Sequence, residues 1–287
     1  MHVIYSELIE GAGILAGGPF YCTENGVDLN NNACTTEPQL IDVNYLEKAT
    51  KVMASVPGWI GDVNNLKDSK VWLFSGKVDS TVVQGVTNKV RDFYSYYGAN
   101  VEYINGIQAE HGFPSDLPQN TLPCNKLSKP WIYGCNYDGA GHLLKHVLGR
   151  SLKPRDLDWK NKGTLYQFDQ TEFVATEDWV KSSFDETGFV YVPKWCEDNG
   201  GCDIHMVFHG CSMGYWNLGT TWVVNTGYLE WAATNNLVVV YPQITKTDTG
   251  YQYPGCWDFW GYSGENYLSR VGIQPVALSK MISRLQK

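Results

Sequence analysis

The chain has 287 residues, a net charge of −8 and a hydrophobic content of 43%. A chain of this length and composition can bury a large core, so we expect one globular domain over residues 1–287. The negative charge and the lack of a lysine or arginine cluster exclude nucleic acid as an expected partner, because phosphate binding depends on basic side chains. No stretch of 18 apolar residues occurs, and no membrane span is expected.

The predicted elements of the first half alternate between strands and helices. We expect a short buried strand with a glycine turn at 11–18, a helix at 45–56, a strand at 71–74, a helix at 82–97 and a strand at 101–104. This alternation is typical of a parallel, doubly wound α/β sheet, whose catalytic groups gather at the carboxyl ends of the strands. Asp79 and His111 each follow such a strand.

The second half begins after a long connection through residues 112–163, and its first strands have no helices between them. We expect strands at 164–168, 188–192 and 204–208, then a helix at 228–233, a strand at 237–241 and a helix at 271–285. We interpret all the strands of the chain as one sheet in a single α/β domain.

Six of the eight cysteines fall into close pairs, which is typical of disulfides. The close pairs are Cys22 with Cys34, Cys124 with Cys135, and Cys196 with Cys202. Cys211 and Cys256 remain as a long-range pair. No pair has the C-x-x-C spacing of zinc sites, so we favour disulfides over free thiols or a metal. Disulfides indicate an oxidising compartment and a secreted protein, although the opening Met1–Ser6 lacks an apolar export signal.

The segment Gly210–Gly214 matches G-x-S-x-G, the nucleophile elbow of serine hydrolases, with Ser212 at its centre. A serine nucleophile needs a histidine base, which a carboxylate orients, and in α/β-hydrolases the histidine follows the serine in the chain. All the histidines precede Ser212; they lie at positions 2, 111, 142, 146, 205 and 209. A nucleophilic Ser212 would therefore require the rearranged order Asp79, His111, Ser212.

Asp79 and His111 do occur in the order expected of a triad acid and base, and His209–Gly210 has the form of an oxyanion-hole loop. That loop follows the base here, as it would in a circularly permuted α/β-hydrolase. Asp79 has a plainer alternative, because it could cap the helix that follows it.

The remaining histidines have structural interpretations. His142 and His146 lie four residues apart on a predicted helix and could share a metal, but no third ligand accompanies them. His205 fits packing within a strand, and His209 is expected to shape the oxyanion loop rather than act as the base.

Several long motifs make the chain resemble the secreted polyhydroxybutyrate depolymerases, which have a circularly permuted α/β-hydrolase fold. In chain order they are AGILAGGPFYC, FSGKVDSTV, AEHGFPSD, CNYDGAG, HGCSMG, NTGYLEWAATNNLVVVYPQ and GCWDFWGY. The resemblance runs from about Met1 to the C-terminus. It implies that Asp79 is the triad acid and His111 the base. It also implies that the Cys211 backbone N–H belongs to the oxyanion hole and that Cys211 is bonded to Cys256.

In this family the serine lies in an elbow roughly ten residues before the segment that matches MHVIYS. The resemblance therefore implies that this chain is truncated at its N-terminus and lacks the central strand and the nucleophile. Ser6 is expected on a helix and follows no strand and turn that could lift its hydroxyl into a site. Loss of a central strand would leave two unpaired strand edges inside the sheet.

The function predicted from the sequence is carboxylic-ester hydrolysis by serine acyl transfer, with no metal and no cofactor. The expected substrate is a hydrophobic polyester, and we expect a monomer. Trp257 is expected to form a flat apolar wall for this substrate, with core packing as its plainer role. One alternative is a feruloyl or acetyl esterase of the same fold. The other is a non-catalytic protein that binds polymer or glycan, favoured if the chain truly starts at Met1.

Overall fold

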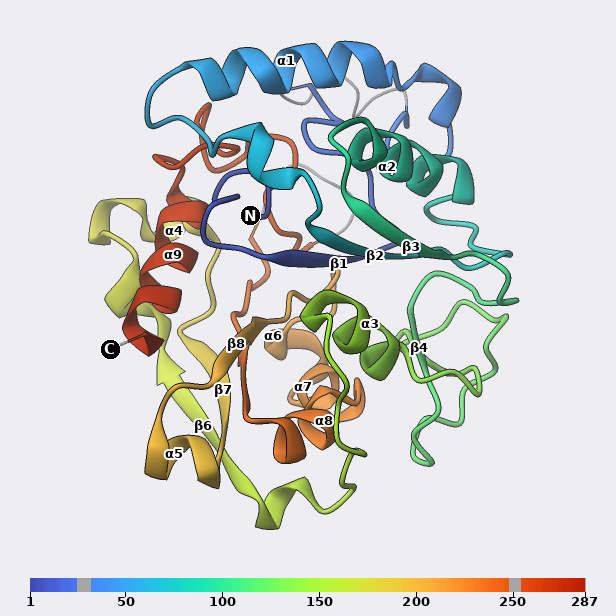
Figure 1. The fold of residues 1–287 in the computed structure, drawn as a ribbon, viewed down its shortest axis with the longest axis vertical. Helices are drawn as coiled ribbons and strands as arrows, with labels where there is room; N and C mark the ends of the chain where they lie inside the picture. The colour runs from blue at the N-terminus through green and yellow to red at the C-terminus, as the bar shows by residue number, and fades with distance from the viewer. Residues whose placement is uncertain (25–31, 248–253, 287) are drawn as a thin grey trace.

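The structure, a computed structural model, describes residues 1–24, 32–247 and 254–286 and combines strands with helices on both sides (Figure 1). The strands are β1 (Gly11–Leu15), β2 (Lys70–Phe74), β3 (Asn100–Ile104), β4 (Phe113–Ser115), β5 (Ile132–Gly134), β6 (Gly163–Asp169), β7 (Thr187–Pro193), β8 (Asp203–Met206) and β9 (Leu237–Tyr241). The α-helices are α1 (Val43–Ser55), α2 (Gln84–Tyr96), α3 (Gly139–Leu148), α4 (Trp179–Ser182), α5 (Lys194–Asn199), α6 (Tyr215–Leu218), α7 (Thr221–Asn225), α8 (Tyr228–Asn235) and α9 (Ile273–Leu285). Short 3-10 helices are η2 (Pro38–Leu40), η3 (Val63–Leu66), η4 (Trp159–Asn161), η5 (Gln170–Phe173) and η6 (Thr176–Asp178).

The first half forms a parallel sheet of order β1-β2-β3. Residues 71–74 of β2 are at most 1% exposed, because helices cover both faces of the sheet. Helices α1 and α2 lie on one side and α3 on the other, as Figure 1 shows. The parallel, doubly wound arrangement predicted for this half is confirmed, and Asp79 and His111 follow β2 and β3.

The second half forms a mixed sheet of order β6-β7-β9-β8. Strand β9 runs antiparallel to β7 and parallel to β8, and all five of its residues are buried. A third, two-stranded parallel sheet of β4 and β5 lies within the long connection, which also contains α3. The expectation of one continuous sheet is therefore wrong for the described residues, because β1 and β8 are both edge strands and do not pair with each other.

A cavity of about 1040 Å³ separates these two edges. Residues 10–15, which include β1, and residues 203–208, which include β8, both line it. Because parallel strands bond to each neighbour through alternate backbone groups, half of the backbone groups of each edge strand point away from its partner. The strand at 11–15 is only partly buried for this reason, whereas the sequence pattern had predicted a buried strand.

The first residues of the chain form successive turns instead of the expected helix. The Tyr5 N–H donates to the Met1 carbonyl and the Ile9 N–H donates to the Tyr5 carbonyl. The Ser6 hydroxyl donates to the Asp62 carbonyl at 2.8 Å and is buried. Ser6 is therefore a structural anchor, and it is not among the residues that line the cavity.

All eight cysteines are joined in four disulfides. The bonded pairs are Cys22 with Cys34, Cys124 with Cys135, Cys196 with Cys202, and Cys211 with Cys256. The first three pairs are those predicted from the spacing of the cysteines. The fourth is the pair that the family resemblance implied. Within the described ranges, no helix has the length and apolar character needed to cross a bilayer.

Candidate active site

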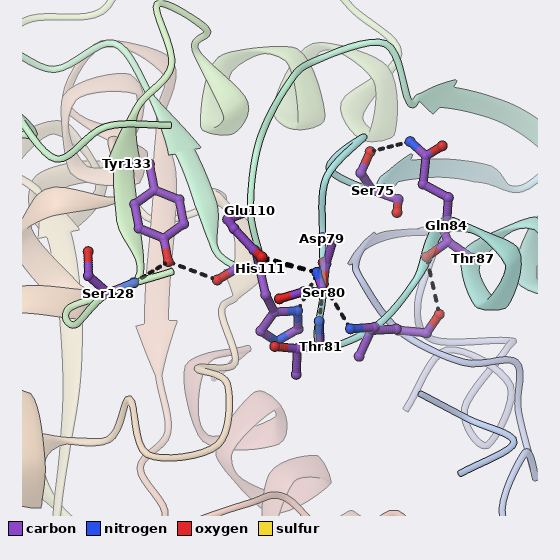
Figure 2. Close-up of polar contacts among 12 residues, drawn as sticks. Ser75, Asp79, Ser80, Thr81, Gln84, Thr87, Glu110, His111, Ser128 and Tyr133 are labelled. Carbon is purple, nitrogen blue, oxygen red and sulfur yellow. Dashed lines mark hydrogen bonds and ion pairs between the residues drawn. The ribbon is translucent and has the colours of Figure 1, made fainter. Parts of the chain in front are cut away.

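Asp79 uses its two carboxylate oxygens for different partners. Its Oδ1 atom accepts hydrogen bonds from the backbone N–H groups of Thr81 at 2.9 Å and Val82 at 2.8 Å, in the turn before α2. Its Oδ2 atom lies 3.0 Å from Nδ1 of His111 (Figure 2). Asp79 does not cap α2, whose N-cap is Val83; one of its oxygens closes the turn before the helix, and the other is left to the histidine. The Asp79 side chain is 1% exposed, so water does not compete for this bond.

His111 is held in place through its ring and its backbone. The Tyr133 hydroxyl donates to the His111 carbonyl at 3.1 Å, and the Ser128 N–H donates to the same hydroxyl (Figure 2). Because an ionised carboxylate only accepts, the bond to Asp79 requires the ring proton on Nδ1. Nε2 makes no hydrogen bond with any described residue, and His111 lines the cavity. The ring therefore presents a free base nitrogen, as a general base requires.

His209 is neutral and structural. Its ring is buried, its Nε2 accepts the Ile244 N–H at 3.1 Å, and its Nδ1 donates to the Gly210 carbonyl at 2.7 Å. Burial lowers the pKa of this imidazole to about 4. Since both ring nitrogens are occupied, His209 is not available as a base, and it fixes the shape of the loop that follows β8.

This burial predicts that acid destabilises the fold. Between pH 6.5 and 4 the unfolded chain protonates His209 while the folded chain does not, so its contribution is present above pH 6.5 and is lost as the pH falls toward 4. We expect the loss to be on the order of 3 kcal/mol in the free energy of unfolding. Urea unfolding at pH 7, 5.5 and 4.5 measures it. His209→Gln should have a smaller pH slope, whereas His142→Gln, at an exposed position, should keep the slope; equal slopes in both variants would contradict this.

Cys211 and Ser212 have different surroundings in the loop after His209–Gly210. The Cys211 N–H has no acceptor among the described residues, and Gly210 lines the same cavity as His111. Both the N–H and the hydroxyl of Ser212 donate to the Pro254 carbonyl, at 2.9 and 3.2 Å. Neither Cys211 nor Ser212 is among the residues that line the cavity. The loop therefore has a free backbone donor at Cys211 and a serine that is bonded elsewhere.

The other histidines do not contact the Asp79–His111 pair, although His205 lines the same cavity. His142 stacks on Tyr137, and His146 pairs with Glu102 at 3.0 Å. The His205 ring packs against Tyr228. In the ranges that the structure describes, no three histidine, cysteine or acidic side chains are grouped as metal ligands would be.

Trp257 packs beside the loop that follows β8. Its ring packs edge-on against Phe184 and Phe208 and at a tilt against His209. It does not belong to the lining of the cavity. The packing role is therefore present, and substrate contact by Trp257 stays a prediction.

Comparison with known proteins shows the family to which the chain belongs. No family model matches the chain. It is 38% identical over 290 residues to a poly(3-hydroxybutyrate) depolymerase of Delftia acidovorans, across 99% of this chain but only 56% of that protein, so it spans little more than half of that relative. It is 31% identical over 301 residues to a polyhydroxybutyrate depolymerase of Talaromyces funiculosus, across 99% of this chain and 84% of that protein.

Solved structures agree with these relatives. A serine-to-alanine variant of a PHB depolymerase, complexed with an R3HB trimer, superposes with a TM-score of 0.86 at 29% identity and covers 99% of this chain and 90% of that chain. The crystal structure of PHB depolymerase from Penicillium funiculosum gives a TM-score of 0.85 with the same coverage and identity. The mixed α/β fold is thus that of solved PHB depolymerases, and the chain belongs to the polyhydroxybutyrate depolymerase family.

Proposed function

We propose that the protein is a carboxylic-ester hydrolase of the polyhydroxybutyrate depolymerase type, in which His111 is the general base and Asp79 orients it. The main support is the 3.0 Å bond between Asp79 Oδ2 and His111 Nδ1, with Nε2 left free beside the cavity. A carboxylate on one ring nitrogen and a free lone pair on the other are the parts that activate a serine in acyl transfer.

We propose that the nucleophile is a serine outside residues 1–287, at the end of a strand seated between β1 and β8. Two free strand edges face the cavity that this strand would fill, and each has unpaired backbone groups to offer it. Gly18 after β1 and Gly210 after β8 line the cavity together with His111. A strand in this position completes one sheet in a single domain, with the circularly permuted order of the family.

The reaction follows from these positions. The serine oxygen attacks the ester carbonyl carbon while His111 Nε2 takes the hydroxyl proton, and the Asp79 carboxylate stabilises the imidazolium. The Cys211 N–H donates to the carbonyl oxygen as it becomes negative. His111 then gives the proton to the alcohol oxygen of the ester as the bond between this oxygen and the carbonyl carbon breaks. The alcohol departs, and the acyl group stays bonded to the serine as an acyl-enzyme. Water, deprotonated by the same base, then releases the acid, and this chemistry needs no metal or cofactor.

For the substrate, we propose a hydrophobic polyester of the 3-hydroxybutyrate type, as in the solved relative that holds an R3HB trimer. A feruloyl or acetyl ester stays the alternative for the same chemistry. The four disulfides and the depolymerase relatives support secretion into an oxidising compartment. We expect a monomer, with Trp257 supporting the oxyanion loop and reaching polymer.

The test of this proposal is ester hydrolysis by a chain that is extended at residue 1 with the strand and serine turn of a family member. We expect the extended chain to hydrolyse a soluble 3-hydroxybutyrate ester and the 287-residue chain to show only the background rate. A folded but inactive extended chain would contradict the proposal. It would favour the non-catalytic, polymer-binding alternative, which the unpaired Nε2 of His111 also fits.

A further inference from the structure

Glu110 connects the two loops that carry Asp79 and His111. Its Oε2 atom accepts the His111 N–H at 2.6 Å and the Ser80 N–H at 3.1 Å, and its Oε1 atom lies 3.2 Å from the same Ser80 nitrogen (Figure 2). Its own N–H donates to the Cys124 carbonyl at 2.8 Å. The residue is 8% exposed. One buried carboxylate is therefore bonded to the neighbour of Asp79 and to His111 itself.

Backbone hydrogen bonds join the two loops at their start but not at Ser80 and His111. The two loops are first joined by direct bonds, from the Lys77 N–H to the Ile107 carbonyl and from the Val78 N–H to the Ala109 carbonyl. One step further along, Ser80 and His111 both present N–H groups to Glu110. Two donors do not bond to each other, so joining the loops at Ser80 and His111 requires an acceptor between these two N–H groups.

The carboxyl of Glu110 is ionised in this position. Burial alone would raise its pKa, but hydrogen bonds from Ser80 and from the His111 N–H hold the pKa below its usual value. An ionised acceptor forms shorter and stronger bonds to N–H groups than a neutral one does.

We infer that Glu110 is a positioning residue that sets the spacing between the Asp79 carboxylate and the His111 ring. This inference rests on the proposed function, because it concerns the pair that the proposal makes acid and base. Asp79 and His111 are 32 positions apart in the chain and meet only through their loops. The Glu110 carboxylate fixes the backbone of both loops, at Ser80 next to Asp79 and at His111. The position of Oε2 sets the spacing of the two loops, because this single atom accepts hydrogen bonds from both of them.

Three substitutions at Glu110 separate position from charge. Glu110→Gln can keep an oxygen at the Oε2 position and loses the charge. Glu110→Asp keeps the charge but is one methylene shorter and does not reach both N–H groups. Glu110→Ala removes both features. Glu47→Ala is the matched control, because Glu47 is equally buried, at 6% exposure, and lies on α1 outside the site.

The experiment uses the 287-residue chain and measures the proton NMR resonance of His111 Nδ1–H, which its bond to Asp79 shifts strongly downfield. Labelling with 15N-histidine and the Asp79→Asn variant assign the resonance, and thermal unfolding is followed for every variant. We expect the resonance in the unsubstituted chain, in Glu110→Gln and in Glu47→Ala, even where the melting temperature falls. We expect its loss in Glu110→Ala and Glu110→Asp.

Persistence of the resonance in Glu110→Ala would overturn the inference, as would its absence from the unsubstituted chain. If the resonance weakened in every variant, Glu47→Ala included, in proportion to the fall in melting temperature, the role of Glu110 would be merely structural. This result would also overturn the inference. Loss in Glu110→Gln with retention in Glu110→Asp would assign the effect to charge and not to position, and would overturn the inference as well. Because no hydrolysis is measured, the outcome is separate from failure of the proposed esterase activity.

Discussion

His111→Ala, made in a chain extended by the strand and serine turn, is expected to lower kcat/KM for a soluble 3-hydroxybutyrate ester by roughly a thousandfold or more. The reason is that His111 Nε2 is the free base nitrogen at the cavity, while both ring nitrogens of His209 are occupied. Asp79→Asn should cause a loss of similar size, because an amide in place of the carboxylate no longer enforces the proton on Nδ1. The two losses should not add, since the residues act as one unit.

The matched control for this prediction is His142→Ala, which removes an exposed histidine that stacks on Tyr137. It should leave kcat/KM within about twofold, because it lies away from the Asp79–His111 pair. Hydrolysis is followed at pH 7.5 at several substrate concentrations, with circular dichroism to show that each variant is folded. The assignment of the base fails if the His111 variant keeps a substantial share of the activity.

Replacement of both Cys211 and Cys256 by serine is the second change with a large expected effect. The disulfide closes a loop with a sequence separation of 45, and its removal is expected to cost about 4 kcal/mol in the free energy of unfolding. It also frees the Cys211 N–H to move, so hydrolysis by the extended chain should fall about a hundredfold, the usual cost of one lost oxyanion donor.

The Cys196–Cys202 disulfide offers the matched control. Its sequence separation is 6, so the same replacement there should cost about 2 kcal/mol and leave kcat/KM unchanged. Urea unfolding without reductant gives both free energies, and the ester assay gives both rates. An equal fall in activity in the two double variants would show that the long disulfide has no special role at the oxyanion loop.

Much of the fold follows from hydrophobic spacing. The helices α1, α2 and α9 and the strands β2, β3 and β9 lie within two residues of the predicted ranges. The helices have apolar residues at helical spacing, and β2 and β9 are uninterrupted apolar runs. The meeting of Asp79 and His111 also follows, since residues after neighbouring parallel strands reach the same edge of a sheet.

Other features depend on contacts that the sequence pattern does not encode. The pattern placed β1 and β8 but did not tell which strands would pair, so the division into separate sheets was missed. Glu110 and Tyr133 hold His111 through backbone groups, which leave no spacing signal beyond the adjacency of Glu110 to His111. Ser212 matches the elbow motif, yet only the structure shows its hydroxyl bonded to Pro254. A local motif defines a turn, while the surroundings decide what the turn does.

We expect Asp79 and His111 to activate a serine seated at the cavity between β1 and β8. The most direct measurement is reaction of the extended chain with a fluorophosphonate, followed by mass spectrometry of its peptides, because the reagent bonds covalently to an activated serine. We predict one phosphonyl group, on the serine of the added turn, and none when His111 is alanine. Label on Ser212, or label on the added serine that persists without His111, would contradict the account.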